Sequence, residues 1–213
     1  MFSGSSWMRL LFLLCFPISA FCDETYGVNV ATQISCEQTK VNWQRIRETF
    51  VKYNEDPSIP YALSFLDALP NKRVSSIGSE QCNEIIKTLD VIFSDKYYRE
   101  FSKKVINGDK YAIEAAVRIH FFAEGGNGES ILIILGDVLR SNPRQLLEVL
   151  YEHIDNLETS DLLGSAVMTK YPIGTEEERN EFKARLFAIR SIKDPKLLKM
   201  KDAYIMEINR ALR

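Results

Sequence analysis

The sequence has few of the residues that usually form metal sites or catalytic centres. Only two histidines, His120 and His153, and four cysteines occur in 213 residues, and the cysteines form no Cys-x-x-Cys pair. The histidines are not spaced as zinc ligands are, and no nucleotide-binding loop or nucleophile motif accompanies them. We therefore expect no structural or catalytic metal and no cofactor.

The chain also lacks a strong charge of either sign. It has 27 basic and 29 acidic residues, for a formal net charge of -2. This balance gives no electrostatic reason to expect nucleic acid or an anionic membrane as the partner. One segment does mix aromatic residues with Lys96, Arg99, Lys103 and Lys104. In a chain that is acidic overall, we interpret this mixture as a solvated helix face.

Long apolar runs are absent beyond the first 22 residues. No later segment has the roughly 18 consecutive apolar residues that a membrane helix requires. The N-terminus differs, because Arg9 precedes an apolar run from Leu10 to Ile18 and small residues follow it. This pattern predicts a secretory signal peptide over residues 1–22.

The end of the signal peptide is open between two positions. Cleavage after Ala20 and cleavage after Cys22 fit almost equally well. Lipidation of Cys22 is the less favoured alternative, because the residue before it, Phe21, is large. We expect the mature protein to be soluble and either periplasmic or secreted. The chain has no Asn-x-Ser/Thr sequon, which favours a bacterial envelope over a eukaryotic secretory route.

Cleavage after Cys22 leaves two cysteines, Cys36 and Cys82. A pair of cysteines in an exported chain predicts a disulfide bond. The bond would tie the polar, irregular arm of residues 23–38 to the first core helices, and closing that loop contributes about 3–4 kcal/mol in the chain-entropy model. The alternative is a buried free thiol at Cys82 and an exposed one at Cys36.

Beyond residue 38, apolar residues recur at spacings of three and four, as they do on one face of a helix. The first such face consists of Trp43, Ile46, Phe50 and Tyr53. Proline, glycine and N-capping residues separate this segment from similar ones that follow. We predict eight or nine helices in a single all-α domain over residues 39–213.

The most apolar part of the chain is expected to form two helices. The first runs over residues 110–124, a break follows at residues 125–128, and the second begins at Glu129. The run over residues 131–135 also fits a buried strand, but the helical signals on both sides favour a helix.

Two capping boxes are expected further along the chain. Asn142 with Gln145 would begin one helix, and Thr175 with Glu178 would begin another. The second helix is predicted to bury an apolar face that consists of Phe182, Leu186, Phe187 and Ile189.

Two of the predicted helices begin with similar tripeptides. Tyr61-Ala62-Leu63 and Tyr111-Ala112-Ile113 lie fifty residues apart, a period typical of HEAT repeats, in which each helix pair must stack on another to bury its inner face. The sequence therefore predicts stacked antiparallel helices, arranged as a HEAT-like α-solenoid or as an irregular helical bundle.

Few residues are candidates for chemistry. His120 follows Ile113 and Val117 along one helical face, so we expect it in the core and not on a metal, although Glu124 is spaced to share its face. The glycine-rich residues 125–128 lack the lysine of a phosphate-binding loop, which favours a tight turn.

Glu129 is the one weak catalytic candidate. A glutamate at the start of a helix, with its pKa raised by an apolar pocket, is the general acid that an all-helical wall-degrading glycosidase requires. Glu129 fits the first turn of a helix equally well because of the helix dipole.

By elimination, the leading hypothesis is an exported helical protein that binds another protein and is not an enzyme. Helical stacks present long surfaces and need no cofactor for this role. In a bacterial envelope, the protein would serve as an assembly adaptor or as an immunity protein that neutralises a toxin. The alternative is a cell-wall glycan-cleaving enzyme that uses Glu129.

Overall fold

The computed structural model describes residues 34–35, 40–75, 82–153 and 164–213. Helices make up most of these residues, which confirms the all-α prediction. Their bounds are α1 Trp43–Glu55, α2 Ile59–Ala68, α3 Asn83–Ile92, α4 Asp95–Ile106, α5 Lys110–His120, α6 Gly125–Ser141, α7 Pro143–Glu152, α9 Glu176–Arg190 and α10 Leu198–Ala211.

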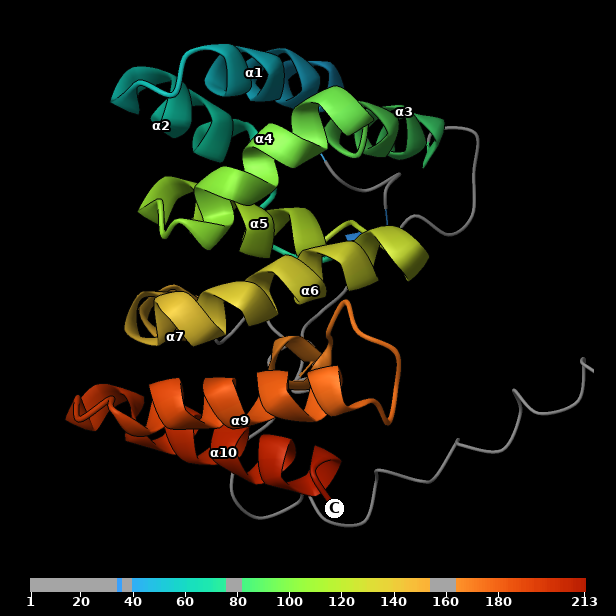
Figure 1. Ribbon diagram of the computed structural model, residues 1–213. Coiled ribbons are helices and arrows are strands. Elements are labelled where there is room, and N and C mark those ends of the chain that lie inside the picture. The colour runs from blue at the N-terminus through green and yellow to red at the C-terminus, as the bar shows by residue number, and fades with distance from the viewer. Residues whose placement is uncertain (1–33, 36–39, 76–81, 154–163) are drawn as a thin grey trace, which may run out of the picture.

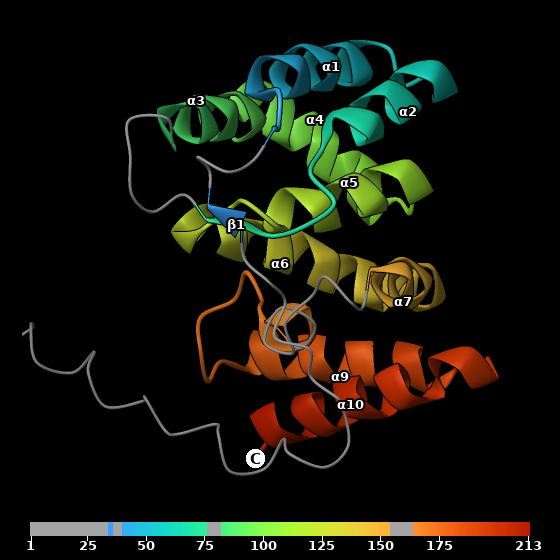
Figure 2. The same ribbon diagram turned by 180° about the vertical axis from the view of Figure 1, so that it is seen from behind.

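The helices stack in two layers. The first layer consists of α1, α4, α6 and α9, and the second of α2, α5, α7 and α10 (Figures 1 and 2). Consecutive helices form packed pairs, and the main contacts join each pair only to its neighbours in the stack. This nearest-neighbour pattern favours the α-solenoid over the irregular bundle. Two features depart from a regular repeat: α3 packs beside α1 and α4, and α7 is seen end-on where α6 lies across the view (Figure 2).

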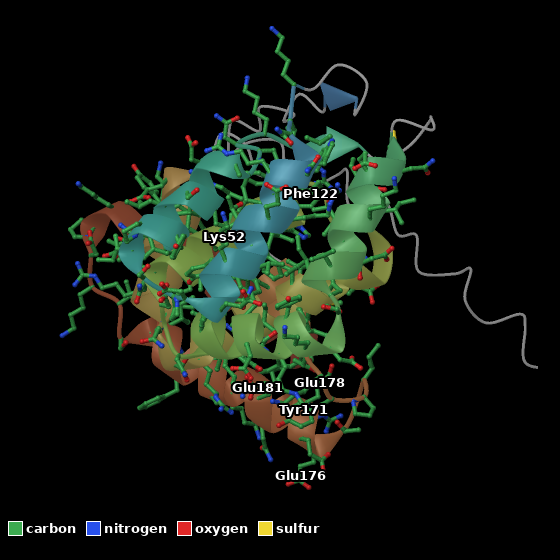
Figure 3. The ribbon with its side chains drawn as sticks, turned by 90° about the horizontal axis from the view of Figure 1, so that it is seen from above. Lys52, Phe122, Tyr171, Glu176, Glu178 and Glu181 are labelled. Carbon is green, nitrogen blue, oxygen red and sulfur yellow. The ribbon has the colours of Figure 1, made fainter. Side chains whose placement is uncertain are left out.

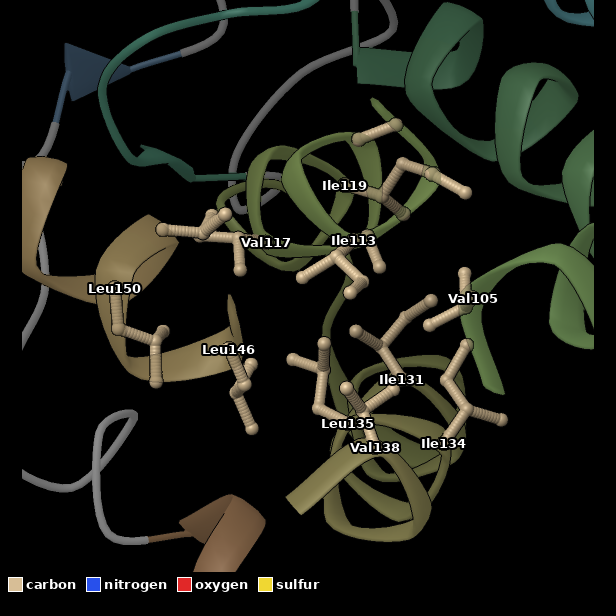
Figure 4. Close-up of a cluster of buried hydrophobic side chains, with 14 of the residues drawn as sticks. Val105, Ile113, Val117, Ile119, Ile131, Ile134, Leu135, Val138, Leu146 and Leu150 are labelled. Atoms are coloured by element: carbon tan, nitrogen blue, oxygen red, sulfur yellow. The ribbon is translucent and has the colours of Figure 1, made fainter. Parts of the chain in front are cut away.

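The centre of the stack is α5, which packs against α2, α4, α6 and α7. Ala112, Ala115 and Ala116 are fully buried and allow these neighbours to approach closely. Larger apolar side chains fill the remaining space, and Figure 4 shows Ile113, Val117 and Ile119 of α5 together with residues of α4, α6 and α7. The hydrophobic core is therefore continuous across the middle pairs.

The first helix pair is held by aromatic residues. Trp43, Ile46, Phe50 and Tyr53 form the buried face of α1, as predicted. The Phe50 ring lies 5.3 Å from that of Phe65 in α2 and 5.6 Å from that of Phe101 in α4, measured between centroids. These rings join the first pair to the second.

Most of the basic residues on α4 are exposed, in agreement with the interpretation of a solvated face. Lys104 is the exception. It is half-buried, and its Nζ donates hydrogen bonds to the carbonyl oxygens of Tyr53 at 2.9 Å and Asn54 at 3.3 Å. This lysine therefore satisfies backbone acceptors in the last turn of α1.

The boundary between α5 and α6 differs from the prediction. The first helix ends at His120, and the glycines expected to break the chain form the first turn of α6. Gly125 has a φ of 56°, and a Cβ at Gly128 would lie 2.8 Å from the Ala123 carbonyl oxygen. Glycine is needed here because the new helix starts against the turn that precedes it. The run over residues 131–135 is helical, as predicted.

Of the two predicted capping boxes, the one at Asn142 is wrong. Asn142 is the single residue between α6 and α7, and its N–H ends α6 by donating to the Val138 carbonyl at 2.7 Å. Its side chain makes no cap bond to α7 and instead donates to Ser141 Oγ at 3.2 Å. Asn142 is still the N-cap residue of α7, where its carbonyl oxygen accepts from the Leu146 N–H at 3.2 Å, but no side-chain capping box forms.

The capping box at Thr175 is correct in part. Thr175 Oγ1 accepts from the Glu178 N–H at 3.2 Å, whereas the Glu178 carboxylate accepts from the N–H of Gly174, one residue before the cap, at 2.6 Å. The helix start that the spacing predicts is therefore present at α9, with a shifted second bond.

A short strand pair accompanies the helices. β1 (Ile34–Ser35) and β2 (Val74–Ser75) pair in parallel, so part of the predicted irregular arm has a regular partner. The Val74 N–H also donates to the Phe121 carbonyl oxygen at 2.8 Å, which attaches β2 to the end of α5.

Candidate functional site

Glu129 is the fifth residue of α6, and its side chain is exposed. A general acid of the predicted kind needs an apolar pocket to raise its pKa. The exposed position does not supply such a pocket, and Glu129 also lies beyond the first helical turn. The structure therefore does not favour the glycan-cleaving alternative.

Cys82, at the N-cap of α3, is buried, with 3% of its surface exposed. Cys36 lies outside the described residues, so the disulfide stays a prediction. The register of the strand pair places Ser35, which immediately precedes Cys36, opposite Ser75. The segment that precedes Cys36 therefore pairs with the segment that precedes Cys82.

His120 is buried at the end of α5, as expected for a core residue. Glu124 lies beyond the end of that helix, at the N-cap of α6, so the two do not share a helical face as their spacing allowed. In the described parts of the chain, no group of three or more His, Cys, Asp and Glu residues could hold a metal ion.

The structure forms one ionic cluster from Glu114, Arg118 and His153. The Glu114 carboxylate accepts a hydrogen bond from Arg118 Nη2 at 2.7 Å, and His153 Nε2 lies 3.7 Å from the same oxygen. Arg118 also donates to the Leu66 carbonyl oxygen at 3.0 Å. The cluster thus links the end of α2 to α5 and α7 in the second layer.

Electrostatics favour the charged form of Glu114. His153 and, to a smaller extent, Arg118 hold the pKa of Glu114 below its ordinary value, against the opposing effect of burial. The 3.7 Å separation from His153 is longer than a hydrogen bond, and the two groups form an ion pair only when His153 is protonated, while Arg118 makes the hydrogen bond. An ionised, paired glutamate of this kind is suited to holding helices together.

A second cluster surrounds Arg185 of α9, whose side chain is fully buried. Its Nε donates to Glu181 at 3.0 Å (Figure 3 labels Glu181), and its Nη1 donates to the carbonyl oxygens of Ser165, Ala166 and Met168 at 2.8–3.2 Å. Burial lowers the pKa of the Arg185 guanidinium, while the charges of Glu181 and Asp137 oppose that effect.

The Arg185 cluster depends on a glycine in the neighbouring helix. A Cβ at Gly136 of α6 would lie only 2.5 Å from Arg185 Nη1. The second carboxylate oxygen of Glu181, Oε2, accepts a hydrogen bond from Arg140 Nη1 of α6 at 3.1 Å. The guanidinium therefore joins α6, α9 and the short helical segment at residues 164–167, and its partners are backbone carbonyls and structural carboxylates.

Sequence reasoning missed both clusters. The i, i+4 spacing of Glu181 and Arg185, and of Glu114 and Arg118, was visible, but such pairs usually lie on solvated helix faces. Burial of these pairs comes from neighbouring helices, which the spacing does not reveal. The paired charges join helices to one another and leave no open acid or base for chemistry among the residues named.

The large apolar side chains at the surface are the remaining candidates for function. Phe187 was predicted to lie on the buried face of α9, but 83% of its surface is exposed. The prediction of Phe187 as a core residue is wrong, because the helix buries Phe182, Leu186 and Ile189 and Phe187 lies on the opposite side. Other exposed apolar residues include Ile59 and Leu63 on α2, Ile86 on α3, Ile173 before α9 and Met206 on α10.

Comparison with protein-family models, curated proteins and solved structures gives no match for this chain. Over the described ranges, none of the helices is long and apolar enough to cross a membrane.

We predict that Arg185→Met destabilises the protein by about 3–5 kcal/mol, because the buried Glu181 would lose one of its two arginine partners and three carbonyls would lose a donor. Urea unfolding followed by circular dichroism measures the change. Arg190→Met, on the exposed side of the same helix, is the matched control and should unfold as the wild type does. Adding Glu181→Leu to Arg185→Met should restore part of the lost stability, and an unaltered Arg185→Met variant would contradict the structural role.

The depressed pKa of Glu114 predicts a dependence of stability on pH. A carboxyl with a lowered folded-state pKa stabilises the fold fully above the pKa of an unfolded glutamate, about 4.3, and that stability is lost as the pH falls through the folded value. Glu114→Gln should therefore be less stable than the wild type at neutral pH. When the pH falls below about 4.3, the variant should lose less of its stability than the wild type loses. Urea midpoints measured from neutral to acidic pH test this, and Glu152→Gln, exposed on α7, should retain the wild-type profile.

Proposed function

We propose that this protein is exported and acts by binding another protein. The observation that carries the proposal is the arrangement of its polar and apolar groups. The ionic clusters lie between helices, while Phe187 and other large apolar side chains remain on the outer surfaces of a helical stack.

A stack of this kind suits protein binding for a physical reason. Each helix pair uses its inner faces for packing, so the outer faces of successive pairs form one extended surface. Residues far apart in the sequence contribute to such a surface, and binding through it requires no cofactor. Exposed aromatic residues supply the contact area that binding hot spots usually need.

Export rests on the predicted signal peptide at residues 1–22 and on the predicted pairing of Cys36 with Cys82. Within a bacterial envelope, two roles fit an exported binding protein: an adaptor in envelope assembly, and an immunity protein that neutralises a toxin delivered to the periplasm. The identity of the partner separates these two roles.

The direct test is affinity purification of the mature chain, residues 23–213, after crosslinking in its own envelope fraction. We expect one co-purifying protein, which should form a stoichiometric complex when the two purified proteins are mixed and examined by light scattering. Recovery of the chain alone would contradict the proposal. Lysis of purified cell wall by the wild type, abolished in Glu129→Gln with helicity intact, would establish the enzyme instead.

The predicted disulfide has its own test. The mature protein, purified without reductant and alkylated, should show no free thiol at Cys36 or Cys82 by mass spectrometry, and a crosslinked peptide should contain both. Reduction should lower the free energy of unfolding by about 3–4 kcal/mol because the unfolded chain regains loop entropy. The double variant Cys36→Ser with Cys82→Ala should unfold as the reduced wild type does and be insensitive to reductant. Two free thiols in the oxidised preparation would refute the bond.

A further inference from the structure

One stripe of exposed residues runs along α9. Arg179, Lys183, Phe187 and Arg190 are spaced by four, four and three residues, so they lie on a single face of the helix, and all four are exposed. The stripe spans about 16 Å at the rise of an α-helix. We call these four residues the α9 stripe.

The opposite side of α9 is used for packing. Arg185 and Glu181 face α6, and Phe182, Leu186 and Ile189 are buried where α9 packs against its neighbours. In the part of the chain that the structure describes, no other helix pair stacks beyond α9 and α10 (Figure 1). The α9 stripe is therefore available to a partner.

The cations of the stripe are not neutralised within the fold. Among the described residues, Arg179, Lys183 and Arg190 take part in no ion pair, in contrast to Arg185 on the inner face. This part of the chain is also more basic than the whole. From the start of α9 to the end of the sequence, residues 176–213 have ten basic and seven acidic residues, a net charge of +3, although the whole chain has a net charge of -2.

We propose that the α9 stripe is the docking surface of the protein, and that its partner is a protein with an acidic patch and an apolar pocket for Phe187. This inference rests on the proposed binding function and names the surface and the chemistry of the partner. A central aromatic residue flanked by cations matches the usual division of an interface into an apolar centre and a charged rim. The cations accelerate association with an acidic partner and orient it.

The same features distinguish a protein partner from a membrane or a nucleic acid. A helix that binds an anionic membrane needs a broad apolar face with cations beside it, and the apolar face of α9 is buried in the fold. Nucleic-acid binding relies on many phosphate contacts along an extended basic surface. The α9 stripe has three cations and one aromatic residue, which suits a compact acidic patch.

The test measures binding of a defined probe to the mature chain, residues 23–213, by fluorescence anisotropy. The probe is a fluorescein-labelled peptide of glutamate with regularly spaced leucines. We expect binding that weakens as salt is added, since screening reduces the attraction between exposed charges. The charge-reversal variant Arg179→Glu with Lys183→Glu, and separately Phe187→Ser, should each weaken binding about tenfold or more.

Matched variants on other helices control for net charge and hydrophobicity. Lys52→Glu with Arg99→Glu reverses two exposed cations on α1 and α4. Lys52 is labelled on α1 in Figure 3, and α1 lies at the opposite end of the stack from α9 and α10 (Figure 1). Leu63→Ser removes an exposed apolar residue from α2. Both controls should bind the peptide as the wild type does, and circular dichroism should show that every variant is folded.

Each other outcome overturns the inference. Absence of peptide binding, equal losses in the stripe and control variants, or tighter binding to phosphatidylglycerol vesicles or single-stranded DNA would each reject an acidic protein partner at the α9 stripe. Binding assays with the co-purified partner distinguish failure of the proposed docking surface from failure of the proposed binding function. If the stripe variants bind it normally, the docking surface is wrong while the binding function stands; if no partner exists, the binding function itself fails.

Discussion

The stacked arrangement depends on α5, whose apolar side chains must be shielded from water by other helices. Seven of its eleven residues are buried, on more than one side of the helix, and a helix that is apolar on several sides must be covered from several directions. Four helices, α2, α4, α6 and α7, supply that cover, and the alanines of α5 let them approach. Each covering helix then has apolar residues of its own on another side. That requirement is met by α1 above and α9 below, so the layered arrangement follows from the composition of one central helix.

A second device joins the pairs. At several places among the described residues, a long cationic side chain from one helix donates to backbone carbonyls where another segment ends. Lys104 reaches the end of α1, Arg118 reaches the Leu66 carbonyl at the end of α2, and Arg185 reaches the carbonyls near residues 165–168. Carbonyls in the last turn of a helix have no partner within the helix. Cations from neighbouring helices satisfy them and favour the negative end of the helix dipole, which couples the ends of helices to the pairs that follow.

The parts of this fold that could be predicted are those that local sequence determines. The apolar residues Trp43, Ile46, Phe50 and Tyr53 lie on one side only, and their spacing predicted the correct helix. Prolines, which were expected to separate the helices, lie in the first turns of α2 and α7. The errors arise where contact with another segment of the chain determines the local structure. Residues 125–128 read as a break, yet they form a helical turn because glycine permits contact with the Ala123 carbonyl. No local pattern indicates that Arg185 is buried, because its burial depends on the space left by Gly136 in another helix. The candidate surface at Phe187 was missed for a related reason, since spacing alone placed an aromatic residue in the core.

The position of Phe187 is what separates the α9 stripe from an ordinary solvated face. Single exposed apolar residues are common on protein surfaces and need no explanation by themselves. A polar outer face is sufficient to end a helical stack and keep it soluble, and the cations of α9 already provide one. Phe187, with 83% of its surface exposed, adds little to the packing of the fold. It stands between cations that have no partners within the described chain, so its apolar area and their charges are both available to the same ligand. Folding accounts for the inner face of α9, and binding is the physical role that fits the outer face.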